Sequence, residues 1–281
     1  MSVIIVCDST ADLPRELIKE YGIHIVPLKV HFGEKEYKDG VDITPKEFYE
    51  KLQASDVLPT TSQPSPGEFA ESYENILKMG GSTIISIHIS AHLSGTYRSA
   101  TVAKSMLPEA DIEVIDSKQA STVLGLIVLE AARAAKSGKT KEEILALIGE
   151  MVEKIKVFFM VDSLEYLEKG GRIGKAQAIL GSMLNIKPIL TLEEGIIVPA
   201  AKTRGRAKGM EQLLLKMKSE IGTGKQARMA IMHAIEYDGM ETLRDRVRNK
   251  WQPEELIVSD IGPVIGTHVG PGTIALIGLK A

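Results

Sequence analysis

The chain has 281 residues, a length that exceeds most single compact cores and suits two domains. Its 34 Lys and Arg against 37 Asp and Glu give a formal net charge of −3 at pH 7, which argues against a dedicated nucleic-acid-binding protein. The single cysteine, Cys7, excludes an intrachain disulfide and a cysteine-based zinc site and favours a reducing cytoplasm. No apolar run reaches the roughly 18 residues of a membrane span, so we expect a cytoplasmic protein whose contact with membranes is at most transient and at their surface.

Strands and helices alternate in the first half of the chain. Short β-branched runs predict strands, whereas apolar residues with a period of 3.6 predict helices. We expect strands at 3–6, 83–89 and 112–115, and helices at 66–80 and 121–138. Because this alternation is typical of a parallel sheet covered by helices, residues 1–156 are predicted to form a parallel-sheet α/β domain.

Three helix starts are predicted from capping boxes, in which Ser or Thr precedes Glu by three residues. The sequences are "TPKE" at 44–47, "SPGE" at 65–68 and "TKEE" at 140–143. The hydroxyl and the carboxylate each accept a hydrogen bond from a backbone N–H that the helix leaves free. Two of the boxes also place Pro at the first helical position, where its missing N–H costs nothing.

Residues 157–281 show a different pattern, with short apolar strands and helices near 205–220 and 239–250. Within it, "LTLEEGIIVP" predicts a hairpin with Glu194 and Gly195 in its turn. We therefore predict a second α/β domain, built on a mixed sheet and joined to the first without a low-complexity linker.

Asp-Ser follows an apolar run three times, at 8–9, 116–117 and 162–163. One interpretation is that these residues cap the next helix. A second, compatible interpretation is that the strand ends line one crevice, because open parallel sheets bind ligands outside the carboxyl ends of their strands.

Two hydroxyl-rich motifs are candidates for an anion site. Thr61 and Ser62 precede a capped helix, whose first-turn N–H groups and dipole favour negative charge. Ser94, Gly95 and Thr96 open another helix, where Gly95 allows a close approach to the backbone and Ser94 is either a cap or a donor to a carboxylate or phosphate. The alternative is that both are polar loops that cap their own helices without a ligand.

His268 lies in "GPVIGTHVGPG", which we expect to form a tight loop before the last strand because glycines and prolines frame it. In such a loop the imidazole is a candidate donor to an anionic head group, and Thr267 supplies a second polar atom. The alternative is a hydrogen-bonded structural histidine.

No metal site is expected. His88 and His92 have the i, i+4 spacing of a metal-binding helix, but "HISAH" contains no acidic residue. It is also expected to be a strand followed by a turn, which does not present both rings on one face. "GGRIGKAQ" at 170–177 does not match a phosphate-binding loop, and its two glycines predict a helix end. Arg172 and Lys175, with "KTRGRAK" at 202–208, suggest a basic face for an anionic partner or lipid surface. A solvated charge cluster without a partner is the alternative.

Seven motifs together closely resemble those of the DegV family, in this order and over nearly the whole chain: "CDSTADLP", "TTSQPSPGEF", "LSGTYRSA", "VIDSKQAS", "LEYLEKGGRIGKAQ", "LNIKPIL" and "GPVIGTHVGPG". The resemblance implies two α/β lobes that hold one long-chain fatty acid, such as palmitate, stearate or oleate. The carboxylate would lie at the interface and the acyl tail in the N-terminal lobe. It implies neither a cofactor nor catalysis by this chain.

Members of the family that act in bacterial fatty acid activation present the bound acid to a separate ATP-dependent fatty acid kinase, and the acyl phosphate passes on toward phospholipid synthesis. Carried over by motif, Thr61 and Ser94 would hydrogen-bond the carboxylate with His268 nearby, supported by Ser62, Gly95, Thr96 and Thr267. Arg172 and Arg204 would face the kinase. The sequence departs from the family at Cys7 and His92.

Two other functions remain open at this point. One is a stand-alone hydrolase or transferase that uses Thr61, Ser94 and His268, although "HLSGT" lacks the first glycine of a nucleophile elbow. The other is a lipid sensor whose occupancy changes contacts of the basic face.

Overall fold

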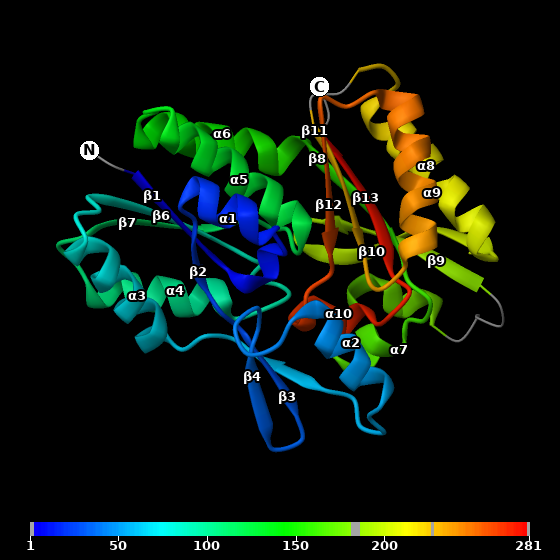
Figure 1. Ribbon diagram of the computed structural model, residues 1–281, viewed down its shortest axis with the longest axis horizontal. Helices are drawn as coiled ribbons and strands as arrows, with labels where there is room; N and C mark the ends of the chain where they lie inside the picture. The colour runs from blue at the N-terminus through cyan, green and yellow to red at the C-terminus, as the bar shows by residue number, and fades with distance from the viewer. Residues whose placement is uncertain (1–2, 181–185, 226–227, 280–281) are drawn as a thin grey trace. The chain divides into compact units, whose positions relative to one another are not determined.

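A computed structural model describes residues 3–180, 186–225 and 228–279 (Figure 1). Contacts divide the chain into two compact units, which we call unit 1 (Met1–Ile43 and Pro59–Glu153) and unit 2 (Thr44–Leu58 and Lys154–Ala281). From the sequence we expected one boundary after residue 156, with 44–58 in the first domain. In the structure, the helix of that segment packs with unit 2.

Unit 1 contains a parallel four-stranded sheet in the order β2-β1-β6-β7, as the alternating pattern predicted. Its strands are β1 (Val3–Asp8), β2 (His24–Val26), β6 (Thr83–His88) and β7 (Asp111–Asp116). The chain leads from β1 to β2 on one side and from β6 to β7 on the other, so the strand order reverses between β1 and β6. Open sheets bind ligands at the carboxyl ends of the strands beside such a reversal.

Helices cover both faces of this sheet (Figure 1). One face carries α1 (Arg15–Tyr21) and α5 (Thr122–Lys136), and the other carries α3 (Pro66–Lys78) and α4 (Thr96–Met106). Phe69 and Tyr73 of α3 are fully buried against Ile84 of β6, and this core fixes the start of α3 next to the sheet. A further helix, α6 (Lys141–Lys154), leads to unit 2.

A second, antiparallel sheet in unit 1 was not predicted from the sequence. It consists of β3 (Lys29–Phe32), β4 (Lys35–Lys38) and β5 (Thr60–Ser62) in the order β4-β3-β5. The strands have only three or four residues and β4 is mostly exposed, so their hydrophobic alternation is too short to recognise. This sheet carries Thr61.

Unit 2 is built on a six-stranded mixed sheet in the order β10-β9-β8-β13-β11-β12, which confirms the predicted sheet type. The strands are β8 (Ile155–Met160), β9 (Ile186–Glu193), β10 (Ile196–Arg204), β11 (Arg228–His233), β12 (Glu255–Asp260) and β13 (Ile274–Leu279). The β9–β10 hairpin forms as predicted, with Glu194 and Gly195 at φ of 48° and 78° in its turn. Leu184 and Asn185 of "LNIKPIL" lie outside the described residues.

Two long helices, α8 (Arg206–Ile221) and α9 (Tyr237–Trp251), pack against one face of this sheet. The fully buried Trp251 anchors them, and its Nε1 donates to the carbonyl of Gly222 at 2.9 Å. Shorter elements are α2 (Pro45–Gln53), α7 (Glu165–Lys169), the 3-10 turn η2 (Gly174–Ile179) and α10 (Pro263–Val269).

All three predicted capping boxes form. Thr44 with Glu47 begins α2, Ser65 with Glu68 begins α3, and Thr140 with Glu143 begins α6. Among the described ranges, none of the helices combines the length and apolar character that crossing a bilayer requires.

Candidate functional site

In unit 1, the candidate hydroxyl groups gather where β6 leads into α4. Ser94 and Thr96 share a hydrogen bond of 2.8 Å between their side-chain oxygens, and the Thr96 N–H points to Ser94 Oγ at 3.3 Å. The N-cap of α4 is Gly95, not Ser94, and it offers no side-chain acceptor to the first turn. The start of α4 therefore combines N–H donors with the half-buried hydroxyl of Ser94, which suits an anion, while the Thr96 hydroxyl is fully buried.

Gln63 connects this group to the motif of Thr61. A Cβ built on Gly95 would lie 2.4 Å from Oε1 and 2.5 Å from Nε2 of Gln63, so the Gln63 amide rests directly against the Gly95 backbone. The structure thus brings the two hydroxyl motifs of unit 1 together. The sequence indicated that Gly95 permits a close approach, but it did not identify the approaching group as Gln63.

Thr61 and Ser62 face opposite sides of β5, because successive side chains alternate along a strand. Thr61 is paired with Val30, which is fully buried, and is itself half-buried. Ser62 is paired with Lys29 on the other face, where its Oγ lies 2.8 Å from Nε2 of His31. The structure therefore keeps Thr61 as a candidate for the anion site and separates Ser62 from it.

A buried chain of hydrogen bonds in unit 1 has the order of a Ser-His-Asp triad. Ser86 Oγ lies 2.7 Å from Nε2 of His88, whose Nδ1 lies 3.0 Å from Oδ2 of Asp8. All three side chains have zero exposure, and the Tyr73 hydroxyl also donates to Ser86 Oγ at 2.8 Å. Because no substrate reaches a sealed serine, this network is structural. His92, by contrast, is exposed.

The Asp-Ser repeats organise the ends of their strands. Asp8 accepts from the N–H of Thr10 at 3.1 Å and caps a 3-10 turn, η1 (Ser9–Ala11), as the capping interpretation expected. Asp116 accepts from the N–H of Lys118 at 2.9 Å within the loop before α5. Asp8 and Asp116 lie at the carboxyl edge of the unit 1 sheet, whereas Asp162 follows a strand of unit 2.

In unit 2, His268 lies in the last turn of helix α10, so the predicted tight loop around it is wrong. Pro263 occupies the first helical position, where proline is well tolerated. Thr267 Oγ1 donates to the Pro263 carbonyl at 2.9 Å, which engages the hydroxyl that we expected to serve as a second polar atom of the site. Gly270, with φ of 75°, ends the helix.

Helix α7 and its C-terminal end pack closely on α10. A Cβ on Gly170 would lie 2.2 Å from Nδ1 of His268, and one on Gly270 would lie 2.4 Å from Cδ2 of Tyr166. Gly170 caps α7, and Gly171 follows with φ of 69°, as the predicted helix end requires. These contacts hold the His268 ring in place.

The electrostatics of this region keep His268 neutral. Burial, with a further contribution from the positive charge of Arg172, lowers the pKa of His268 from 6.5 to about 4. Arg172 donates from NH1 to the carbonyl of Gly170 at 2.7 Å. At neutral pH the imidazole therefore offers one N–H donor and one acceptor without a net charge.

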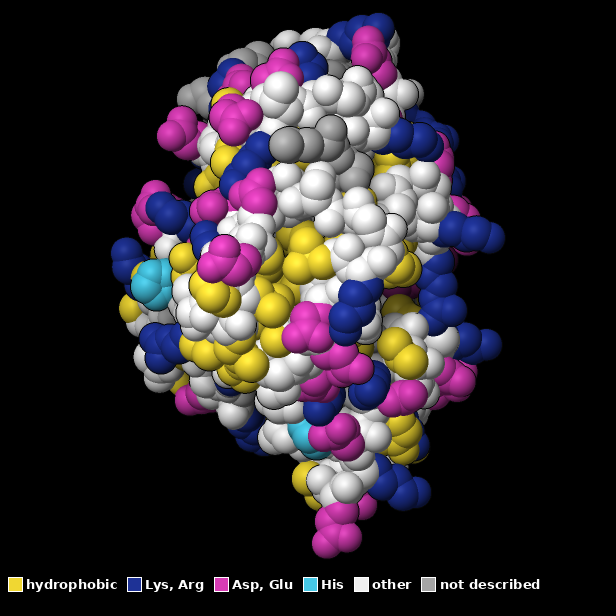
Figure 2. Space-filling model, turned by 90° about the vertical axis from the view of Figure 1, so that its left-hand side faces the viewer, with side chains coloured by type: hydrophobic (Ala, Val, Ile, Leu, Met, Phe, Trp, Pro, Cys, Tyr) yellow, Lys and Arg dark blue, Asp and Glu magenta, His cyan; other side chains and the backbone are white. Residues whose placement is uncertain are grey.

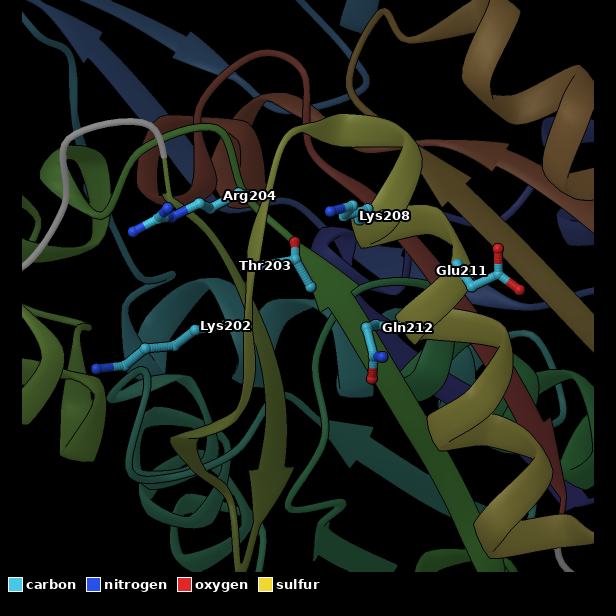
Figure 3. Close-up of a pocket in the computed structure, with 6 residues that line it drawn as sticks. All are labelled: Lys202, Thr203, Arg204, Lys208, Glu211 and Gln212. Atoms are coloured by element: carbon cyan, nitrogen blue, oxygen red, sulfur yellow. The ribbon is translucent and has the colours of Figure 1, made fainter.

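A basic pocket of about 350 Å³ lies between β10 and α8 in unit 2 (Figure 3). It is lined by Lys202, Thr203, Arg204, Lys208, Glu211 and Gln212. On the face drawn in Figure 2, acidic and basic side chains intermingle around an apolar patch. The pocket, with three cationic side chains and one carboxylate, therefore has a local excess of positive charge.

Only part of the basic segment 202–208 contributes to this pocket. Arg206 instead connects three segments of unit 2. Its Nη1 lies 2.8 Å from Oδ1 of Asp162, and its Nη2 lies 3.0 Å from Oε2 of Glu236 and donates to the Gly272 carbonyl at 2.8 Å. Arg204, predicted to face a partner, lines the pocket, whereas Arg172 lies beside His268. Within the described part of the chain, no group of three or more His, Cys, Asp or Glu side chains is arranged to hold a metal ion.

Comparison with known proteins agrees with these motifs over the full length. The model of a family described as "Uncharacterised protein, DegV family" matches residues 2–280. A DegV domain-containing protein of Halalkalibacterium halodurans is 39% identical over 98% of this chain and 97% of its own.

Two solved structures are also similar. One is the structure of a DegV family protein from Thermus thermophilus, described as showing fatty acid binding. It has a TM-score of 0.94 and 37% identity, and the match covers 100% of both chains. The other, a stearic acid-binding protein from Eubacterium ventriosum, has a TM-score of 0.85 and 29% identity over 98% of this chain and 97% of its own.

Proposed function

This chain belongs to the DegV family, and we propose that it binds one long-chain fatty acid and presents its carboxylate to a separate ATP-dependent fatty acid kinase. Thr61 and Ser94 donate hydrogen bonds to the carboxylate, and His268 lies near it. The observation that carries the proposal is the convergence of the two hydroxyl motifs in unit 1, where Gln63 rests on Gly95. Relatives described as fatty acid-binding proteins support it.

The chemistry of the hydroxyl cluster suits a carboxylate. Half-buried hydroxyls and the uncapped start of α4 supply oriented donors, and the helix dipole adds partial positive charge. A neutral His268 adds a donor without an ion pair. The acyl chain supplies most of the affinity, since each buried methylene contributes about 0.8 kcal/mol.

We propose that the chain itself does not catalyse a reaction. Within unit 1, the hydrogen bonds of Ser94 Oγ go to Thr96, and neither a histidine nor a carboxylate is among these partners. A serine nucleophile needs a base within hydrogen-bond reach. The chain of hydrogen bonds from Ser86 through His88 to Asp8 is sealed from solvent.

The kinase is proposed to dock on the basic pocket, through Arg204 with Lys202 and Lys208, and near Arg172. None of the three pocket cations forms an ion pair with another described residue, so their charge is available to an acidic surface. The acyl phosphate formed on the bound acid would then pass toward phospholipid synthesis.

Native mass spectrometry of the purified protein, followed by denaturing extraction, tests fatty acid binding directly. We expect one long-chain fatty acid per chain, or uptake of one added stearate. A protein that is empty and takes up no stearate would contradict the proposal. Hydrolysis of an added acyl ester by the chain alone, lost in Ser94→Ala, would instead support the stand-alone enzyme.

The docking step is tested with a separate ATP-dependent fatty acid kinase, ATP and the stearate-loaded protein. Arg204→Ala and Lys208→Ala should lower acyl phosphate formation and kinase binding while stearate stays bound. The matched control is Lys218→Ala, an exposed cation on the same helix that does not line the pocket. Equal activity of all three variants would remove the pocket from the docking surface.

A further inference from the structure

We propose that the Gln63 amide is an additional head-group donor, which lies over the Ser94 hydroxyl cluster and distinguishes a carboxylate from an uncharged lipid head group. This inference rests on the proposed fatty acid binding and adds a residue to it. Gln63 directly follows β5, and its side chain reaches the start of α4, where its amide lies against Gly95.

The position of Gln63 follows from strand geometry and from the contact with Gly95. Side chains two residues apart along an extended chain point to the same side, so Gln63 continues the face of β5 that carries Thr61 and not the face that carries Ser62. Gly95 lies between Ser94 and Thr96, whose hydroxyls are 2.8 Å apart. The Gln63 amide is therefore placed next to Ser94, the hydroxyl of this pair that we assign to the carboxylate.

The chemistry of an amide suits a carboxylate at this place. Gln63 is exposed, and its Nε2 carries two N–H donors while its Oε1 accepts. A hydrogen bond from a neutral donor to a charged acceptor is stronger than one between neutral groups. The amide thus favours a carboxylate over an alcohol or an ester at the head-group position.

Gly95 is the residue that makes this placement possible. Its φ is −75°, so alanine fits the backbone, but a Cβ would occupy the space of the Gln63 amide. Since the obstructed atoms are the far end of a flexible side chain, Gly95→Ala should displace the amide and leave the fold intact. The two positions should therefore act as one unit in a double-mutant cycle.

The experiment measures stearate and octadecanol binding to the full-length protein, after delipidation, for wild type and variants. We expect Gln63→Ala and Gly95→Ala each to weaken stearate binding about tenfold or more, and the double variant to weaken it no further than Gln63→Ala does. Gln63→Glu should weaken stearate binding more than Gln63→Ala, because two carboxylates then meet. Octadecanol binding should change less than threefold in every variant.

Gln252→Glu is the matched control, since it makes the same chemical change at an exposed residue that follows α9. Thermal unfolding of the empty proteins checks that each variant folds. Stearate binding of Gln63→Ala and Gln63→Glu at wild-type strength would overturn the inference and leave the proposed function standing. A wild-type protein that takes up no stearate would overturn both.

Discussion

The backbone of Gly170, at the end of α7, lies directly against the imidazole of His268 on α10, and a Cβ on Gly170 would come within 2.2 Å of Nδ1. No group larger than hydrogen fits between the ring and this backbone. The position of a candidate head-group histidine is therefore set by a glycine almost a hundred residues away in the chain.

Gly170→Ala should accordingly destabilise the protein and move the ring. The backbone of Gly170 has φ of −76°, which alanine adopts, so the effect comes from the clash and is expected to cost about 1–3 kcal/mol in unfolding free energy. Urea denaturation measures it. Gly149→Ala is the control: Gly149 is exposed in α6 with no atom within 4 Å of its Cβ position, so alanine should stabilise by about 0.5–1 kcal/mol. Similar behaviour of the two variants would contradict the prediction.

Acid should destabilise unit 2 through His268. Its pKa is about 4 in the folded protein and near 6.5 in the unfolded chain, so the unfolded state binds the proton first as pH falls. The stability contribution is fully present above pH 6.5 and is lost progressively as pH falls through 4, by about 3 kcal/mol in total. Urea denaturation of wild type and His268→Gln between pH 4 and 7 isolates this contribution, because the stability of wild type relative to the variant should fall as pH falls. A difference that does not change with pH would assign the effect to other groups.

The opposite pH dependence is expected from Asp39 in unit 1. Burial, opposed by a hydrogen bond from Ser9 and reinforced by the charge of Asp8, raises the pKa of Asp39 from 3.8 to about 7. The folded state therefore holds a proton that the unfolded chain releases. The stabilising contribution is complete below pH 3.8 and falls by about 4 kcal/mol as pH rises through 7.

Asp39→Asn tests this directly, because an amide stays neutral at all these pH values. Oδ2 of Asp39 has no hydrogen-bond partner among the described residues, so a neutral side chain suits the site. The variant should be more stable than wild type at pH 8 and lose that advantage by pH 4 in chemical denaturation. A variant that is less stable than wild type at pH 8 would show that the carboxylate has a compensating partner.

The Ser86, His88 and Asp8 network should matter for stability and not for chemistry. Ser86→Ala leaves the Tyr73 hydroxyl and Nε2 of His88 without their buried partner, which is expected to cost about 1–3 kcal/mol in unfolding free energy. A fluorophosphonate probe should not label Ser86 in the folded protein. Labelling that is abolished by Ser86→Ala would identify an accessible nucleophile and support the enzyme interpretation.

Local signals in the sequence predicted much of the fold. Capping boxes located three helix starts, because the reciprocal hydrogen bonds of Ser or Thr with Glu need only four neighbouring residues. The turn at Glu194 and Gly195 was predicted for the same reason, since Gly195 readily adopts the positive φ that the turn requires. Both features depend on contacts close in sequence.

The predictions that failed depended on contacts between residues distant in sequence. The glycines around His268 indicated a loop, yet Gly266 lies in a helix, where a Cβ would come within 2.6 Å of the Tyr49 hydroxyl. Gly270 ends this helix, and a Cβ there would come within 2.4 Å of Cδ2 of Tyr166. A sequence does not distinguish a glycine needed for backbone conformation from one needed for a close approach. Gln63 was missed for the same reason, because its importance depends on its contact with Gly95.

Thr61→Ala and Ser94→Ala should each weaken retention of a bound fatty acid. Each removes a hydroxyl donor to a charged carboxylate, which is worth about 1.5–3 kcal/mol, or roughly 10- to 150-fold in affinity. Stearate affinity of the delipidated proteins is the measurement, and Ser105→Ala is the matched control. Ser105 lies exposed on α4, where its hydroxyl donates to the Val102 carbonyl at 2.6 Å, so its loss should leave affinity unchanged. Wild-type affinity in both Thr61→Ala and Ser94→Ala would remove these residues from the site, because a hydroxyl that donates to the carboxylate cannot be lost without weakening stearate binding.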